Sequence, residues 1–142
     1  MILITGLGNP GNEFLKTRHN IGFDIIDSIH SKFDFPRFSE KFNSLYSKKT
    51  INDKIIVIQK PMSYMNLSGD PIKKIFSFFK INDTQDIFVF HDDLDLEFSS
   101  LRIKNSGKLN SEWIESTISK PTLCLVFKNS LPGLPSPVIK II

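Results

Sequence analysis

The feature that most constrains the fold is the start of the chain, where an apolar run ends in a glycine-rich loop. Met1–Thr5 (MILIT) is short, apolar and bounded by glycine, which predicts a buried β-strand. Gly6–Gly11 (GLGNPG) follows as a loop, and Thr17–Asn20 (TRHN) places polar side chains just before a helical pattern begins at Ile21. Because ligands of open α/β sheets bind outside the carboxyl ends of the strands, this stretch predicts one side of a binding site.

His19 is the candidate general base in this stretch. Imidazole is the only side chain whose ordinary pKa places its charge change near neutrality, and Arg18 and Asn20 flank it here. The same pattern is equally consistent with a histidine that only caps the loop.

Composition narrows the class of protein. A chain of 142 residues makes one domain that can bury a core. Its single cysteine, Cys124, excludes an intrachain disulfide, and no Cys/His cluster has metal-ligand spacing, which is typical of the reducing cytosol. No apolar run reaches about 18 residues, so we expect a soluble protein that is not exported and not membrane-bound. The net charge of +3 is compatible with a polyanionic partner without requiring one.

The middle of the chain alternates helical and strand patterns. Apolar spacing predicts an amphipathic helix over Ile21–Phe33 with Asn20 as its N-cap, and Asp34–Phe42 shows no period and is expected to be a connection. Two runs, Ser44–Thr50 and the β-branched, apolar Lys54–Gln59, flank Asn52 and Asp53 and predict a hairpin that Lys60 and Pro61 end.

The next segments repeat the arrangement of the first. A polar loop over Met62–Gly69 precedes a second helical pattern at Ile72–Phe79, and Ile87–Phe90 predicts another buried strand. That strand leads into His91–Asp95 (HDDLD), whose spacing matches no metal motif; Asp92 is a candidate carboxylate to hold a histidine, and a solvated acidic turn is the alternative. Leu101–Lys104 is a short alternating segment.

Polar groups therefore follow three predicted strands. Short strands alternating with helices imply an α/β sheet with helices on its faces, and the three strand ends lie on one edge of such a sheet. The sequence predicts that Asn9 and His19, Asn66 and Asp92 converge there.

Three motifs in this order resemble bacterial-type peptidyl-tRNA hydrolase. They are Gly6–Gly11 with Thr17–Phe23, Lys60–Gly69 and His91–Leu96, and the resemblance extends from Met1 to about Lys104. It implies a single α/β domain with a mixed, twisted sheet flanked by helices over residues 1–118, followed by a divergent proline-containing tail over residues 119–142. It also implies hydrolysis of the ester between a peptide and the 3′ end of tRNA, which recycles tRNA in translation. The expected protein is a cytoplasmic monomer that binds the acceptor stem and 3′ end of peptidyl-tRNA and uses no metal or cofactor.

The resemblance also assigns roles to residues. His19 would be the general base, Asp92 would hold its tautomer and stabilise its charged form, and Asn66 would position substrate and stabilise the oxyanion. Phe14 stands where the family commonly has tyrosine, which keeps stacking and loses a hydroxyl. The remaining expected substrate or tRNA contacts are Asn9, Met65, Lys104 and Asn110. An acyl-enzyme route has little support, because the chain has no Gly-x-Ser-x-Gly and Cys124 lies outside the motifs.

After Lys104 the resemblance ends. The family continues with Gly-Gly-His-Asn-Gly-Leu, whose asparagine helps position the water, whereas ungapped alignment here places Trp113, and Asn110 aligns only with a gap. Residues 112–115 can be encoded so that the next reading frame gives Asn-Gly-Leu-Lys, so either a frame change or ordinary divergence explains this region. Two further alternatives to an active hydrolase follow: a homologue that binds tRNA without turnover, and a decayed gene product without function.

Overall fold

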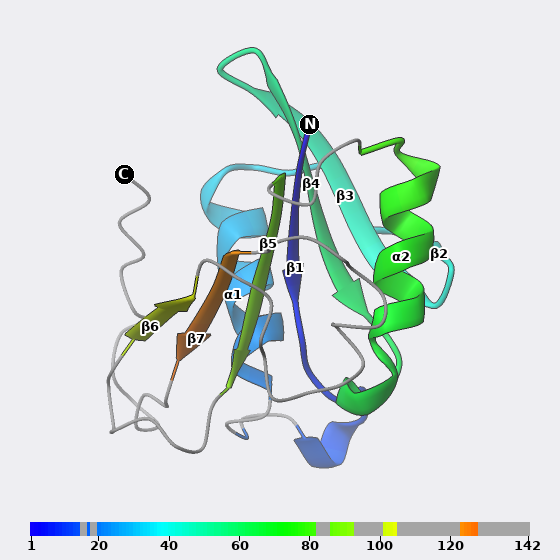
Figure 1. Ribbon diagram of the computed structural model, residues 1–142, viewed down its shortest axis with the longest axis vertical. Coiled ribbons are helices and arrows are strands. Elements are labelled where there is room, and N and C mark those ends of the chain that lie inside the picture. The colour runs from blue at the N-terminus through cyan, green and yellow to red at the C-terminus, as the bar shows by residue number, and fades with distance from the viewer. Residues whose placement is uncertain (15–16, 18–19, 82–85, 93–100, 105–122, 128–142) are drawn as a thin grey trace.

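A computed structural model describes residues 1–14, 17, 20–81, 86–92, 101–104 and 123–127. Seven strands form one mixed sheet in the order β2-β3-β4-β1-β5-β7-β6 (Figure 1). β4, β1, β5 and β7 are parallel, and the outer neighbours β3, β2 and β6 pair antiparallel. The strands are β1 (Ile2–Gly6), β2 (Ser39–Lys41), β3 (Ser44–Ile51), β4 (Lys54–Pro61), β5 (Ile87–Asp92), β6 (Leu101–Lys104) and β7 (Leu123–Phe127). The predicted single domain with a mixed sheet flanked by helices is confirmed.

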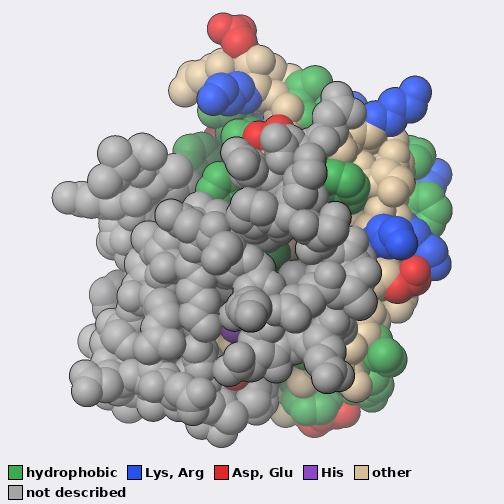
Figure 2. All heavy atoms as spheres, viewed as in Figure 1, with side chains coloured by type: hydrophobic (Ala, Val, Ile, Leu, Met, Phe, Trp, Pro, Cys, Tyr) green, Lys and Arg blue, Asp and Glu red, His purple; other side chains and the backbone are tan. Residues whose placement is uncertain are grey.

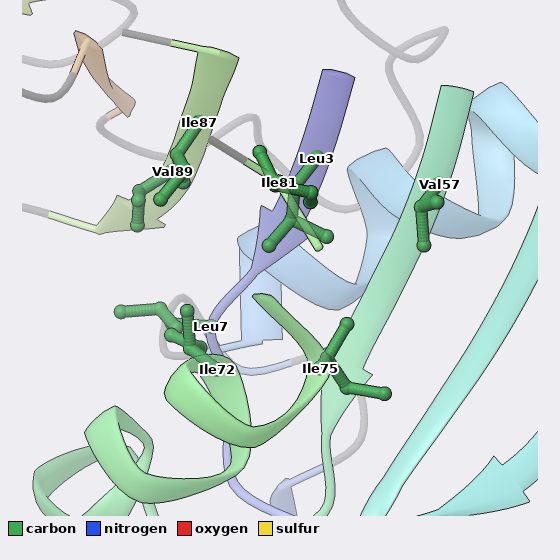
Figure 3. Close-up of a cluster of buried hydrophobic side chains, with 8 residues drawn as sticks. All are labelled: Leu3, Leu7, Val57, Ile72, Ile75, Ile81, Ile87 and Val89. Atoms are coloured by element: carbon green, nitrogen blue, oxygen red, sulfur yellow. The ribbon is translucent and has the colours of Figure 1, made fainter. Parts of the chain in front are cut away.

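In the described part of the chain, two α-helices cover opposite faces of this sheet. Successive strand residues alternate between faces, so Leu3 lies in the cluster under α2 (Gly69–Phe78), while its neighbour Ile4 packs against the cluster under α1 (Ile21–Lys32). Figure 3 shows the α2 cluster, in which strand side chains meet Ile72 and Ile75 from the helix. Of the helices in the described part of the chain, none combines the length and apolar character needed to cross a bilayer.

Most of the predicted elements are confirmed with shifts of a few residues at their ends. The helices and the β3–β4 hairpin form where the apolar patterns place them, and β4 continues two residues beyond the predicted Gln59, through Lys60 and Pro61. One expectation is wrong: the segment expected to be a connection contains β2, which pairs with β3 at the sheet edge. All three β2 residues are exposed, so they carry no apolar alternation that a sequence pattern could reveal.

Two glycines let α1 sit directly on the end of β1. A Cβ on Gly6 would lie 2.0 Å from the carbonyl oxygen of Gly22, and a Cβ on Gly22 would lie 2.3 Å from that of Leu7. Since these neighbours are backbone atoms, no rotamer change could relieve the overlap. Gly6 at the end of β1 and Gly22 in the first turn of α1 therefore form one close backbone contact between the strand and the helix.

An aromatic and basic cluster lies where the C-terminal end of α2 meets β2. Lys41 places its ammonium 4.3 Å from the ring centre of Phe78, and Phe78 contacts the Phe42 ring edge-to-face at 5.7 Å. Figure 2 shows blue lysine and arginine side chains gathered along the α2 side of the molecule, with green hydrophobic side chains between them. Phe42 and Phe78 are both exposed, and the Lys41 ammonium covers part of the surface of their rings.

Candidate active site

The candidate site lies at the carboxyl ends of the central parallel strands. In the sheet, β4 lies on one side of β1, and β5, β7 and β6 lie on the other. The direction in which the chain adds strands therefore reverses between β1 and β5. Ligands of α/β sheets bind at such a reversal, and the region outside the carboxyl ends of β1 and β5 is called the crevice below. Leu7 continues the contact between the two strands by donating its backbone N–H to the Phe90 carbonyl at 2.8 Å.

Asn9 joins the first motif loop to the second. Its side-chain Oδ1 accepts a hydrogen bond of 2.9 Å from the backbone N–H of Met65, 56 residues later in the chain. Met65 begins η3 (Met65–Leu67), the short 3₁₀ helix that also contains Asn66. The predicted convergence of the first two strand ends is therefore present in the structure.

Asn20 holds the backbone of Asn9 at two points. Its Oδ1 accepts a 2.7 Å hydrogen bond from the Asn9 N–H, and its Nδ2 donates to the Asn9 carbonyl at 3.1 Å. Asn20 is only 4% exposed, so the two bonds satisfy a buried amide. Asn20 stands at the N-cap position of α1, as expected, but its side chain makes no capping hydrogen bond because it is directed to the loop.

The contact between Asn20 and the first loop depends on Gly8. A Cβ at residue 8 would lie 2.8 Å from Asn20 Oδ1 and 2.8 Å from the Phe23 ring. Sequence reasoning missed this role of Asn20, because no local pattern pairs residues 9 and 20. The available signal was a polar residue placed between a glycine loop and an apolar helix.

Replacement of Asn20 by alanine is expected to loosen the first loop. The variant leaves the Asn9 N–H and carbonyl without their partners in a partly buried place, which should lower the free energy of unfolding by about 1–3 kcal/mol. Urea denaturation followed by circular dichroism measures this loss. Asn12→Ala is the control, since Asn12 is exposed in the adjacent η1 (Asn12–Phe14), and an equal loss in both variants would contradict the two-point hold.

Phe14 and Tyr64 extend the contact between the two loops. Their rings meet edge-to-face with centroids 6.4 Å apart, so the end of η1 rests against the loop before η3. Tyr64 and Asn66 are exposed beside this contact, while Phe14 and Met65 are partly buried. This side of the crevice therefore offers an exposed carboxamide next to aromatic surface.

Asp92 ends β5 on the other side of the crevice. It is partly buried and pairs in register with Phe127 of β7, while its backbone oxygen contacts Nδ1 of His91. Asp92 is thus the last residue of the strand next to β1, and its role as a carboxylate that holds a histidine stays a prediction.

Three predicted site residues remain: Lys104, His19 and Asn110. Lys104 ends β6 and pairs with Cys124 of β7, while His19 and Asn110 lie outside the described residues. In the part of the chain that the structure describes, no group of three or more histidine, cysteine, aspartate or glutamate residues is arranged to hold a metal ion.

Comparison with known proteins agrees with these motifs. A model of the peptidyl-tRNA hydrolase family matches residues 3–119. The peptidyl-tRNA hydrolase of Fusobacterium nucleatum subsp. nucleatum is 43% identical over 107 residues, which is 75% of this chain and 56% of that protein. The one from Ehrlichia ruminantium is 47% identical over 105 residues, covering 74% of this chain and 54% of that protein.

Solved structures extend the similarity to the fold. The crystal structure of peptidyl-tRNA hydrolase from Acinetobacter baumannii matches with a TM-score of 0.80 and 29% identity over 94% of this chain and 70% of that chain. The chain spans about half the length of the curated relatives it matches.

Proposed function

Since the chain belongs to the peptidyl-tRNA hydrolase family, we propose that it hydrolyses the ester between a peptide and the 3′ end of tRNA. The observation that carries the proposal is the hydrogen bond from Met65 N–H to Asn9 Oδ1, which brings two of the motif loops together beside the crevice. Asp92 is the last residue of β5, on the other side of that crevice. This arrangement supports a single site built from all three motifs.

In the proposed reaction, His19 takes a proton from a water molecule, which attacks the carbonyl carbon of the ester. Asp92 holds the imidazole in the required tautomer and stabilises the imidazolium that forms. Asn66 donates its amide N–H to the oxyanion of the tetrahedral intermediate, an interaction that strengthens as negative charge develops. The C–O bond of the ester then breaks, the peptide leaves with a carboxyl group, and the His19 imidazolium returns its proton to the 3′ oxygen of tRNA.

The proposed binding residues surround these groups. Asn9, Phe14 and Met65 would contact the peptide or the terminal nucleotide, with Asn110 as a further contact. Lys104 would meet a phosphate of the acceptor stem, a contact that weakens with salt. We place this reaction in the cytoplasm, where the chain would act as a monomer during translation.

The direct test is release of labelled peptide from peptidyl-tRNA by the purified chain, with deacylated tRNA binding measured in parallel by fluorescence anisotropy. Cleavage above the rate of spontaneous hydrolysis supports the proposal. A folded chain that binds tRNA without cleaving the ester would contradict it and select the binding homologue instead. That second outcome has a specific basis, because the family loop with Gly-Gly-His-Asn-Gly-Leu has no counterpart after Lys104.

Replacement of Asn66 by alanine is expected to reduce kcat by about 10²–10³, the usual effect of removing one oxyanion donor. The exposed position of Asn66 predicts little change in stability, so the circular dichroism spectrum and melting temperature should be retained. Single-turnover release of peptide measures the chemical step. Asn43→Ala replaces an exposed asparagine in the turn before β3 and should keep full activity, and an Asn66→Ala variant as active as this control would exclude the oxyanion role.

A further inference from the structure

Two fully buried polar side chains lie side by side under α2. Thr5 of β1 and Gln59 of β4 are each 0% exposed and are direct partners in the parallel register of the two strands. Leu3 and Val57, two residues earlier on the same strands, point into the cluster under α2 (Figure 3). Side chains two residues apart share a face, so Thr5 and Gln59 continue that face towards the start of the helix.

The amide nitrogen of Gln59 connects three elements. Its Nε2 donates one hydrogen bond to Ser44 Oγ of β3 at 2.8 Å and another to the carbonyl oxygen of Pro71 at 3.2 Å. Pro71 lies in the first turn of α2, which begins directly after η3 and Ser68. Gln59 therefore ties the sheet to the helix start that follows the loop bearing Met65 and Asn66.

The oxygens of this buried pair have unused hydrogen-bonding capacity. In the described part of the chain, neither Thr5 Oγ1 nor Gln59 Oε1 makes a hydrogen bond to another protein atom. Buried polar atoms are costly unless they are paired, and internal water commonly supplies the partner. Thr5 and Gln59 are partners on neighbouring strands. Gln59 Oε1 offers a water molecule an acceptor, and the Thr5 hydroxyl can both donate to the water and accept from it.

We propose that Thr5 Oγ1 and Gln59 Oε1 bind one internal water molecule, and that this water and the Gln59 amide form a polar layer that positions the start of α2. The water donates one hydrogen to Gln59 Oε1 and bonds the Thr5 hydroxyl with another of its groups. The layer makes Gln59 a positioning residue for the loop with Met65 and Asn66. Its consequence for catalysis rests on the proposed function, whereas the water and the position of α2 do not.

A double-mutant cycle tests the water. Thr5→Val removes the hydroxyl at nearly constant shape, and Gln59→Leu removes the carboxamide. Thr5→Val is expected to reduce the folded-to-unfolded ratio about fivefold in the natural chain and to leave it unchanged or raise it in the Gln59→Leu background. Equal effects in both backgrounds would overturn the bridge. A high-resolution crystal structure should show the water within hydrogen-bonding distance of both oxygens, and a direct bond between Thr5 and Gln59 would also overturn it.

Two serines of β3 provide a matched test of the positioning role. Ser44 and Ser47 are both buried, but Ser44 accepts from Gln59 on the α2 side, whereas Ser47 donates to the Pro36 carbonyl at 2.6 Å. Each alanine variant removes one hydroxyl: Ser47→Ala loses the bond to Pro36, and Ser44→Ala loses the bond from Gln59 together with a long 3.5 Å bond to the Phe42 carbonyl. Amide hydrogen exchange then reports on the helix start through the N–H groups of Met65 and Ile72, with Val57 as the reference for global unfolding.

Ser44→Ala is expected to accelerate exchange at Met65 and Ile72 by about three- to tenfold relative to Val57, while Ser47→Ala leaves this ratio unchanged. Equal ratios in the two variants would overturn the positioning role. The measurement needs only folded chain, so it gives an answer even if the chain releases no peptide. Where peptide is released, Ser44→Ala should lower kcat with KM retained, and Ser47→Ala should change neither.

Discussion

Replacement of His19 by alanine is expected to lower kcat for peptide release by about 10²–10⁴, the range for a general base. Attack on an ester by water requires removal of a proton, and alanine at residue 19 offers no group to accept it. The loss should appear in kcat and in kcat/KM together, since the base acts in the transition state and not in tRNA binding. Single-turnover release of labelled peptide measures the step, and anisotropy with deacylated tRNA measures binding.

His30→Ala is the matched control for this experiment. His30 lies near the end of α1, where its ring stacks on Phe38 at 4.4 Å and its Nε2 hydrogen-bonds the Pro36 carbonyl at 3.0 Å. These contacts join α1 to the segment that contains Pro36 and Phe38. Loss of the His30 imidazole should therefore reduce the stability of the fold slightly and leave kcat unchanged. A His19→Ala variant that keeps the activity of the His30→Ala control would exclude the base assignment.

Replacement of Gly22 by alanine is expected to destabilise the fold by about 3 kcal/mol, the upper range for overpacking a tight contact. The added Cβ would lie 2.3 Å and 2.4 Å from the Leu7 carbonyl oxygen and nitrogen and 2.6 Å from the Phe90 carbonyl oxygen. Helix propensity acts in the opposite direction, because alanine inside a helix is favoured over glycine by about 1 kcal/mol. The overlap should prevail because all three neighbours are backbone atoms, so α1 must move away from β1 and β5.

Urea denaturation followed by circular dichroism measures this effect, with Ser31→Ala as the control. Ser31 is exposed on α1, and its replacement should change the free energy of unfolding by no more than about 0.5 kcal/mol. A Gly22→Ala variant that is as stable as the natural chain would mean that α1 can shift without lowering the free energy of unfolding. Because Asn20 at the start of α1 holds the Asn9 backbone, a shift of α1 disturbs the first loop, and we expect peptide release to fall with stability.

Local patterns in the chain were sufficient for most of the elements. The apolar run at Met1–Thr5 and the spacing of isoleucines after Ile21 predict β1 and α1, since burial repeats with the period of each structure. The β3–β4 hairpin follows from the β-branched run Lys54–Gln59 and the run before it, which flank Asn52 and Asp53. The placement of Asn9 beside Met65 also follows, because polar residues after parallel strands gather on one sheet edge.

The roles of His19, Asn66, Asp92 and the other site residues come from the motif resemblance and stay predictions. The division of the chain at residue 118 likewise stays a prediction, although β7 pairs with β5 in the same sheet as the motif strands. The short apolar run Leu123–Phe127 forms β7, and no local pattern indicates its position between β5 and β6.

Neighbouring residues alone indicate most of the strands and helices along the chain and the family to which the motifs belong. Three features emerge only in the folded chain: Asn20 holds the Asn9 backbone instead of capping α1, Gly6 and Gly22 form one contact, and β2 forms the sheet edge. The difference lies in the range of the interactions. Periodic burial is written in neighbouring residues, whereas a buried hydrogen bond or a close backbone approach depends on residues that only folding brings together.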